Sequence, residues 1–317
     1  MPKCERLSSH KVSIIIPSHE DGHFLIGLLD SISAHLNIEY EAIIVVNNCT
    51  DNSAEIGDDA GCKVITTAEK LYPSQARNLG AMHASNQLLV FLDADVVITA
   101  EWARELSRLT QRSDSFFTGE TYLISTQPSY IEMYWFEPLR AKSKCYINGG
   151  NIVISRTLFD LLGGFDEMLE TGEDVEFSHR AKNSTNNFEF NHNLRVHHEG
   201  FPKKLGQFIK RERWHGRGDL ISTGLFLKSK IAILSSFFLI SHLALFIGIV
   251  FGYAPTVILA SAIITVICVG SSIWNFWYVG VSQIVRGCSI YYIYFLGRGL
   301  SIVDRFVSMV DKKKLNN

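Results

Sequence analysis

The stretch Leu89-Val90-Phe91-Leu92-Asp93-Ala94-Asp95 is an apolar run that stops at two carboxylates separated by one residue. A short, continuous apolar run predicts a buried strand. Such a strand presents both acids at its carboxyl edge, where open α/β sheets bind their ligands. Asp93 and Asp95 therefore predict a binding site for a divalent metal and a diphosphate.

The metal that suits this pair is Mg²⁺ or Mn²⁺. These hard ions need few protein ligands, because they keep several coordination positions for water and phosphate oxygens. The alternative is that Asp93 and Asp95 only begin a turn, where Asp is common for its local hydrogen bonding. An isolated Asp-x-Asp occurs often by chance, so the interpretation depends on the surrounding motifs.

Earlier apolar runs predict the fold class. Residues 12–17 and 42–46 are short and β-branched, residues 62–66 form a weaker third run, and residues 88–92 continue the series. Each run is separated from the next by a plausible helix. Strands that alternate with helices predict parallel pairing in a layered α/β sheet.

Charge is unevenly distributed along the 317 residues. From Lys228 onward there are eight basic and two acidic residues, so this part carries +6, and the preceding part, with 22 basic and 30 acidic residues, carries −8. The acidic part argues against nucleic acid as a partner, and the basic end fits a membrane surface. The scattered cysteines and the polar N-terminus without a signal-peptide core indicate a cytoplasmic setting.

Two uncharged segments predict a membrane hairpin. Residues 231–252 and 256–274 contain no Asp, Glu, Lys or Arg, and about 20 residues of helix cross a hydrocarbon layer of about 30 Å. The connector between them is three residues long, so the two helices must be antiparallel neighbours. Buried core helices are the alternative.

Basic residues flank this hairpin and predict its orientation. They place both ends, and the large N-terminal domain, at the cytoplasmic face of a cell membrane that the chain crosses more than once. We take residues 1–227 as the cytoplasmic domain and 228–317 as the membrane region. Within the latter, residues 289–310 predict an interfacial amphipathic helix, with a third span as the alternative. His242 is expected to donate a hydrogen bond between helices.

Further motifs surround the Asp pair in a particular order. They are Val12-Ser13-Ile14-Ile15-Ile16-Pro17-Ser18-His19-Glu20-Asp21, Val45-Val46-Asn47-Asn48-Cys49-Thr50-Asp51-Asn52-Ser53, Ser74-Gln75-Ala76-Arg77-Asn78-Leu79-Gly80, Gly163-Gly164-Phe165-Asp166-Glu167 and Gly172-Glu173-Asp174-Val175-Glu176. In this order they resemble the glycosyltransferases of family 2. The resemblance covers residues 12–214 and implies the GT-A fold, a Rossmann-like mixed sheet flanked by helices, with a core at about residues 12–217.

The resemblance implies a nucleotide-diphosphate sugar as donor. Pro17, Asp21, Asn47 and Asn48 would hold its base and ribose in the crevice beyond the sheet. This chain departs from the family here, because Glu20-Asp21 replaces Asn-Glu and an Asp of the second motif is missing. The identity of the nucleotide therefore stays open, and ordinary turn chemistry is the alternative for these side chains.

The resemblance also implies ligands for the diphosphate and the metal. Arg77, at the start of a helix predicted over residues 75–83, would clamp a phosphate, or else form a salt bridge. Asp93 would contact the nucleotide sugar and the metal, Asp95 the metal. One of His197 and His198, for which we name His198, would complete the metal site. The glycines at 149, 150, 163 and 164 would permit tight backbone turns near the sugar pocket.

Asp174 is the residue that the resemblance implies as general base. An acceptor hydroxyl has a high pKa and needs a carboxylate within hydrogen-bond reach to take its proton. Glu173 would help to bind the acceptor. The alternative is that Asp174 only places a charge in the first turn of a helix over residues 174–182.

Lys210-Arg211-Glu212-Arg213-Trp214 resembles the Gln-x-x-Arg-Trp element of processive family members, with Lys in place of Gln. Arg213 would meet the diphosphate and Trp214 would stack on an acceptor sugar. Alternatively, residues 203–217 form a basic helix on anionic lipid.

Together these expectations describe a metal-dependent inverting transferase at the membrane, with a lipid-linked or saccharide acceptor and a role in envelope or exopolysaccharide synthesis. Two spans are few for a polymer channel, which favours single transfer. The alternatives are transfer to polyprenyl phosphate, an inactive scaffold subunit of a glycan synthase, and a nucleotidyltransferase. The last usually has an early Gly-rich phosphate loop, and none follows Ile16.

Overall fold

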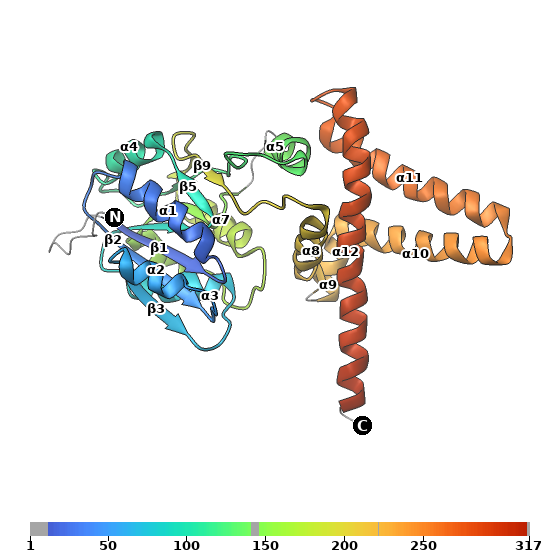
Figure 1. Cartoon of the computed structure of the whole chain (residues 1–317), viewed down its shortest axis with the longest axis horizontal. Helices are drawn as coiled ribbons and strands as arrows, with labels where there is room; N and C mark the ends of the chain where they lie inside the picture. The colour runs from blue at the N-terminus through green and yellow to red at the C-terminus, as the bar shows by residue number, and fades with distance from the viewer. Residues whose placement is uncertain (1–11, 141–145, 221, 316–317) are drawn as a thin grey trace. The chain divides into compact units, whose positions relative to one another are not determined.

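The computed structural model describes residues 12–140, 146–220 and 222–315 (Figure 1). Contacts within the chain divide it into two compact units. The first contains the described residues up to Thr126 and those from Tyr146 to Phe201, and the second contains the segment that begins at Gln127 and everything from Pro202 onward. The two units are described separately below.

This division differs from the boundary at residue 227 that composition suggested. Residues in the middle of the first unit's sequence, from Gln127, join the second unit. The ring of Trp135 packs there against Phe208, Phe276 and Tyr291 in an aromatic cluster of the second unit. Aromatic packing of this kind stabilises the association of this segment with the helices.

The first unit is built on a mixed sheet of seven strands in the order β3-β2-β1-β4-β7-β6-β8. Strands β1 to β4 pair in parallel, as predicted, whereas β7 runs antiparallel to both β4 and β6. The predicted mixed α/β sheet is therefore confirmed. The strands are β1 (Val12–Ser18), β2 (Tyr40–Asn47), β3 (Lys63–Thr67), β4 (Leu88–Leu92), β6 (Phe117–Gly119), β7 (Asn151–Ser155) and β8 (Phe188–Phe190).

Apolar side chains fill both faces of this sheet. On β4, Val90 and Leu92 join one cluster, and Leu89 and Phe91 join the other. Alternate residues of a strand point to opposite faces, so a continuous apolar run is what a strand between two helical layers requires. The helices of this unit are α1 (Gly22–His35), α2 (Ser53–Asp59), α3 (Pro73–Met82), α4 (Ala100–Leu109), α6 (Arg156–Leu162) and α7 (Glu173–Ser184).

A small second sheet lies beyond the carboxyl end of β4. It pairs β5 (Val96–Ile98) with β9 (Val196–His198) in antiparallel register, and Val96 lies opposite His198. The chain thus passes from β4 through the Asp pair directly into β5. Because β5 pairs with β9, His198 lies near the carboxyl end of β4.

The second unit is helical. Its elements are η1 (Glu132–Phe136), α5 (Glu137–Arg140), α8 (Leu205–His215), η2 (Gly218–Leu220), α9 (Thr223–Lys228), α10 (Lys230–Phe251), α11 (Ala254–Phe276) and α12 (Val281–Leu315). Helices α10 and α11 lie side by side as a hairpin, and α12 crosses its base (Figure 1). Both hairpin helices are long and apolar enough to cross a membrane. The predicted helix over 289–310 is part of the longer α12.

Candidate functional site

Strand β4 delivers the Asp pair to the edge of the sheet. The backbone N–H of Asp93 donates to the Gly150 carbonyl at 3.2 Å, which extends the pairing of β4 with β7 by one residue. Both carboxylates are largely buried, with 26% of the Asp93 side chain and 21% of the Asp95 side chain exposed. The two acids therefore form a partly buried acidic cluster at the strand's carboxyl end.

The small sheet brings His198 to these acids. Its Nε2 lies 3.4 Å from Asp95 Oδ2, and the backbone N–H of Glu199 donates to the Asp95 carbonyl at 2.7 Å. His197 instead turns away, with Nδ1 2.8 Å from the Ile124 carbonyl oxygen. Of the two neighbouring histidines, the structure therefore brings the one that we named toward the acids.

Two glycines make room for the carboxylates. A Cβ built at Gly150 would overlap the Asp93 carboxylate, and one built at Gly200 would overlap Asp95 Oδ2. The absence of a side chain, rather than an unusual backbone angle, is what matters at both positions. Gly163 and Gly164 differ, because each has a φ of +74°, a left-handed conformation that glycine adopts most easily.

Arg77 joins the Asp pair to the second acidic motif. From helix α3, its Nη2 donates to Asp93 Oδ1 at 2.7 Å and its Nη1 donates to Glu173 Oε1 at 2.7 Å. Only 5% of its side chain is exposed. Of the two uses that the sequence left open, the structure displays the ion-pair geometry, and it is a buried one rather than a surface pair.

Tyr122 is a site residue that the sequence did not reveal. Its hydroxyl donates to Asp93 Oδ2 at 2.6 Å and accepts from the Gly150 backbone N–H at 3.0 Å. Its ring also packs against the His198 ring, with 4.5 Å between centroids. Tyr122 stands in an irregular segment outside every motif, so no pattern pointed to it.

The pKa values of the two acids shift in opposite directions. Burial tends to raise the pKa of Asp93, but Arg77 and the Tyr122 hydroxyl outweigh burial and hold that pKa below its ordinary value. Burial and the neighbouring Asp93 charge raise the pKa of Asp95 to about 7. Asp95 is therefore the carboxylate with the most to gain from a nearby positive charge.

These residues fit a divalent metal. One ligand atom from each of Asp93, Asp95 and His198 can be chosen so that all three lie within 4.8 Å of one another. Two carboxylates and one imidazole are a donor set that Mn²⁺ accepts, and Mg²⁺ accepts the carboxylates. Because Arg77 and Tyr122 engage both Asp93 oxygens, Asp95 and His198 are the more available donors.

Asp174 lies in the first turn of α7 next to Glu173. The Gly149 backbone N–H donates to its Oδ2 at 3.2 Å. Burial, followed by the charge of Glu173, raises the pKa of the Asp174 carboxyl to about 7. A carboxylate that titrates near neutrality is suited to accept a proton at physiological pH.

The residues predicted to hold the nucleotide lie at the ends of β1 and β2. Burial raises the pKa of Asp21 to about 6, and the charges of Asp95 and Asp93 add to the increase. Asp21 is therefore close enough to the acidic cluster of Asp93 and Asp95 to interact with its charges. Pro17 is the second-last residue of β1 and lies opposite Val45 of β2. The Asn47 amide is occupied by the backbone of Leu71, to which it donates at 2.9 Å and from which it accepts at 2.7 Å.

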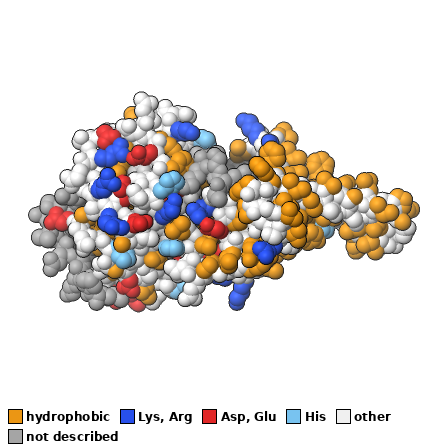
Figure 2. All heavy atoms as spheres, turned by 90° about the horizontal axis from the view of Figure 1, so that it is seen from above, with side chains coloured by type: hydrophobic (Ala, Val, Ile, Leu, Met, Phe, Trp, Pro, Cys, Tyr) orange, Lys and Arg blue, Asp and Glu red, His pale blue; other side chains and the backbone are white. Residues whose placement is uncertain are grey.

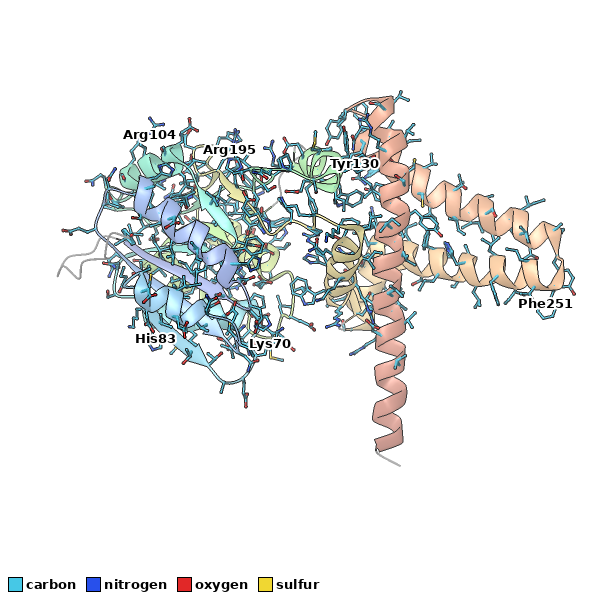
Figure 3. The ribbon with its side chains drawn as sticks, viewed as in Figure 1. Lys70, His83, Arg104, Tyr130, Arg195 and Phe251 are labelled. Carbon is cyan, nitrogen blue, oxygen red and sulfur yellow. The ribbon has the colours of Figure 1, made fainter. Side chains whose placement is uncertain are left out.

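The loop after β3 therefore depends on the two asparagines. Asn48 has a φ of +50° and donates to the Ala68 carbonyl, one residue beyond β3. Lys70, labelled in Figure 3, places Nζ 2.8 Å from His19 Nε2. In this structure Asn47 and Asn48 form hydrogen bonds to the backbone of the loop after β3. Their contact with a nucleotide stays a prediction.

Arg213 and Trp214 lie on α8 in the second unit. Arg213 Nε donates to Asp304 Oδ2 of α12 at 2.6 Å, and Trp214 is partly exposed. Their predicted contacts with diphosphate and acceptor sugar stay predictions.

The seven-stranded mixed sheet with its flanking helices has the GT-A fold. Residues 13–165 match the model of the family described as glycosyl transferase family 2. This match covers just under half of the chain and confirms the resemblance that the motif order predicted.

Relatives by sequence point the same way. The chain is 29% identical over 145 residues to the 4,4'-diaponeurosporenoate glycosyltransferase of Staphylococcus haemolyticus, an alignment that covers 44% of this chain and 37% of that protein. It is 22% identical over 162 residues to an Escherichia coli UDP-Glc:alpha-D-GlcNAc-diphosphoundecaprenol beta-1,3-glucosyltransferase, WfgD, covering 49% of this chain and 64% of that one. The matches thus span well under the full length of these relatives.

A solved structure supports the fold over nearly the whole chain. The mannosyltransferase PcManGT of Pyrobaculum calidifontis, in complex with GDP-Man and Mn²⁺, aligns with a TM-score of 0.56 and 14% identity, covering 96% of this chain and 90% of that one. At this identity the likeness establishes the fold.

Proposed function

We propose that this protein is a metal-dependent, inverting glycosyltransferase that transfers a sugar from a nucleotide-diphosphate donor to a lipid-linked or saccharide acceptor. The observation that carries the proposal is the ion-pair bridge of Arg77, which joins Asp93 to Glu173. Glu173 directly precedes Asp174 in α7, so this bridge supports a metal site and a general base that lie near each other.

Asp174 acts as the general base. Its carboxylate accepts the proton of the acceptor hydroxyl as that oxygen forms a bond to the anomeric carbon. The bond from the anomeric carbon to the diphosphate oxygen breaks in the same displacement, and the electron pair leaves with the nucleoside diphosphate. A single in-line displacement inverts the anomeric centre.

Asp95, His198 and Asp93 would hold Mg²⁺ or Mn²⁺. When bound, the ion supplies positive charge that stabilises the departing diphosphate. The mannosyltransferase of similar fold from Pyrobaculum calidifontis is described in complex with Mn²⁺, which is compatible with a metal in this proposal. Arg77 and Tyr122 orient Asp93, and Gly150 and Gly200 leave the space that the carboxylates occupy.

The acceptor side of the proposal rests on the second unit. Two long apolar helices favour attachment to a membrane, and the basic residues around them favour a cytoplasmic catalytic domain. The name of the Escherichia coli relative specifies a sugar diphosphate linked to undecaprenol, which supports a lipid-linked acceptor here. Such an acceptor would reach the site from the bilayer, in synthesis of an envelope or exopolysaccharide unit.

The test is product analysis. Membranes containing the full chain are incubated with a panel of nucleotide sugars, Mn²⁺ and extracted lipid, and new glycolipids are identified by mass spectrometry with their anomeric configuration. We expect one donor to give a product of inverted configuration, abolished by a chelator. Absence of both product and donor binding across the panel would favour an inactive scaffold instead.

A further inference from the structure

The hairpin α10–α11 is held at its base by α12. On α10, the Phe238 ring packs against Phe295, and His242 Nε2 lies 2.9 Å from the Tyr292 hydroxyl. On α11, Ser272 Oγ donates to the Ile284 carbonyl at 2.7 Å. These contacts join the middle of α10 and the last half of α11 to one side of α12.

Helix α12 also has a charged partner on its opposite side. A Cβ at Gly299 would press on Leu239 of α10, whereas one at Gly297 would press on Glu212 of α8. Residues two apart on a helix point about 200° away from each other. Helix α12 therefore lies between the apolar hairpin and the basic helix α8. Helices α12 and α8 together form a charged layer at the base of the hairpin.

The charges of α12 fix the level at which this layer can lie in a bilayer. Arg286 is exposed, Arg298 pairs with Glu212 and Asp219, and Asp304 pairs with Arg213. Charged side chains are costly at the centre of a bilayer, so this layer belongs at the level of the headgroups.

The hairpin beyond this layer is too short to reach the other side. On α10, nine residues lead from His242 to the end of the helix at Phe251. On α11, ten residues lead from Ala254 to Ile264, the first residue of α11 in the buried cluster that includes residues of α12. At 1.5 Å per residue these lengths are about 14 and about 15 Å. The hydrocarbon core measures about 30 Å.

The free end of the hairpin is apolar on the outside. Phe251, labelled in Figure 3, is 67% exposed, and Ile258 is 70% exposed. No Asp, Glu, Lys or Arg occurs in the sequence from Ile231 to Val285, so the turn at Gly252 lacks the charged residues that would favour a watery far interface. In Figure 2 this end carries hydrophobic side chains on the face that is visible.

We infer that the α10–α11 hairpin enters only one leaflet and ends near the bilayer midplane, with α12 lying in the headgroup region of the same leaflet. Its partner is therefore the acyl-chain layer of one leaflet. This inference rests on the membrane attachment in the proposed function. If the hairpin spanned the bilayer, α12 with Arg286 and Arg298 would be drawn toward the hydrocarbon.

The test is thiol accessibility in sealed proteoliposomes. Single cysteines are placed at the tip (Tyr253→Cys, with Ala254→Cys as a second variant) and before the hairpin (Lys228→Cys) in a cysteine-free full chain that still resists carbonate extraction. A thiol in hydrocarbon is poorly ionised and sees no aqueous reagent, so we expect tip labelling by an impermeant maleimide at least ~10-fold slower than at residue 228, from either side. A fluorophore at the tip should be quenched most by lipids with deep spin labels.

Each other outcome is decisive. Labelling of the tip only from the side opposite to residue 228 would mean a spanning hairpin and overturn the inference, while the proposed function would stand. Labelling from the same side would mean that the hairpin does not insert. Release of the unmodified chain by carbonate would overturn the membrane attachment itself, and the inference with it.

Discussion

The proposed role of Asp174 as general base is tested by removing its charge. Replacing Asp174 with Asn removes the proposed proton acceptor but preserves size, so we expect kcat to fall about 10²–10⁴-fold, the usual contribution of a general base, with little change in the donor KM. The matched control is Glu101→Gln, an exposed acid in the first turn of α4. Full activity of the Asn variant on polyprenyl phosphate would favour an acceptor that is already anionic and needs no base.

The pH profile tests the same residue. Burial and Glu173 raise the pKa of Asp174 to about 7, and only its deprotonated form accepts a proton, so kcat/KM should rise as pH increases through about 7. Glu173→Gln removes a neighbouring negative charge, which favours ionisation of Asp174. The midpoint should therefore move to lower pH. Profiles are measured at saturating Mn²⁺, and an unchanged midpoint would assign the titration to another group.

Gly200 tests the space around Asp95. The Cβ of Gly200→Ala would overlap Asp95 Oδ2, so the carboxylate must move, and we expect Mn²⁺ affinity to fall at least ~10-fold, the size of effect seen when support of a metal ligand is lost. Gly206→Ala is the control, because a Cβ there meets no atom within 4 Å. Mn²⁺ titration by electron paramagnetic resonance measures both. Equal affinity in the two variants would exclude Asp95 from the metal site.

Helix α8 is fixed to α12 by a buried ion pair. Arg298 Nε lies 3.1 Å from Glu212 Oε2, and Glu212 also pairs with Arg211 at 2.6 Å. Arg298→Met leaves Glu212 with one cation fewer, and we expect a loss of about 2 kcal/mol, as for a hydrogen bond to a charged group. Arg104→Met, at an exposed position of α4, is the control.

Thermal unfolding and limited trypsin digestion of the detergent-solubilised chain measure this loss. In the double variant with Glu212→Gln, the two losses should not add, because the residues share one interaction. Additive losses would show that the two side chains act independently.

Elements with strong local patterns could be predicted from the sequence. The parallel strands β1, β2 and β4 are largely apolar and buried, and α10 and α11 contain long uncharged runs, so each was evident without its neighbours. Strand β3, with two threonines and a lysine, gave the weaker signal. Strands β6 and β8 have only three residues each, and their pairing depends on β7 and on neighbours far apart in sequence. Patterns of that length carry too little information to predict.

The site shows the same limit. The acids that follow β4 were predictable, because a strand end fixes their place. The choice between His197 and His198 depends on the register of β9 against β5, which no local pattern encodes. Tyr122 and Gly200 contribute through contacts with Asp93 and Asp95 that exist only in the folded chain. The residue types of the metal site could thus be predicted, whereas contacts between residues far apart in the sequence could not.

For the whole molecule, the inferred depth of the hairpin predicts how activity responds to bilayer thickness. A hairpin that enters one leaflet touches only the near headgroups and acyl chains, so changes in total thickness impose little mismatch on it. We expect a probe at Tyr253→Cys to stay at a constant depth below the near headgroups in short-, medium- and long-chain phosphatidylcholine, with similar turnover in all three. A spanning hairpin must instead follow the far interface by tilting or by thinning the lipid. Depth is measured by parallax quenching, with a probe at Lys228→Cys as the headgroup reference, and a tip that moves away from this reference as the bilayer thickens would contradict the prediction.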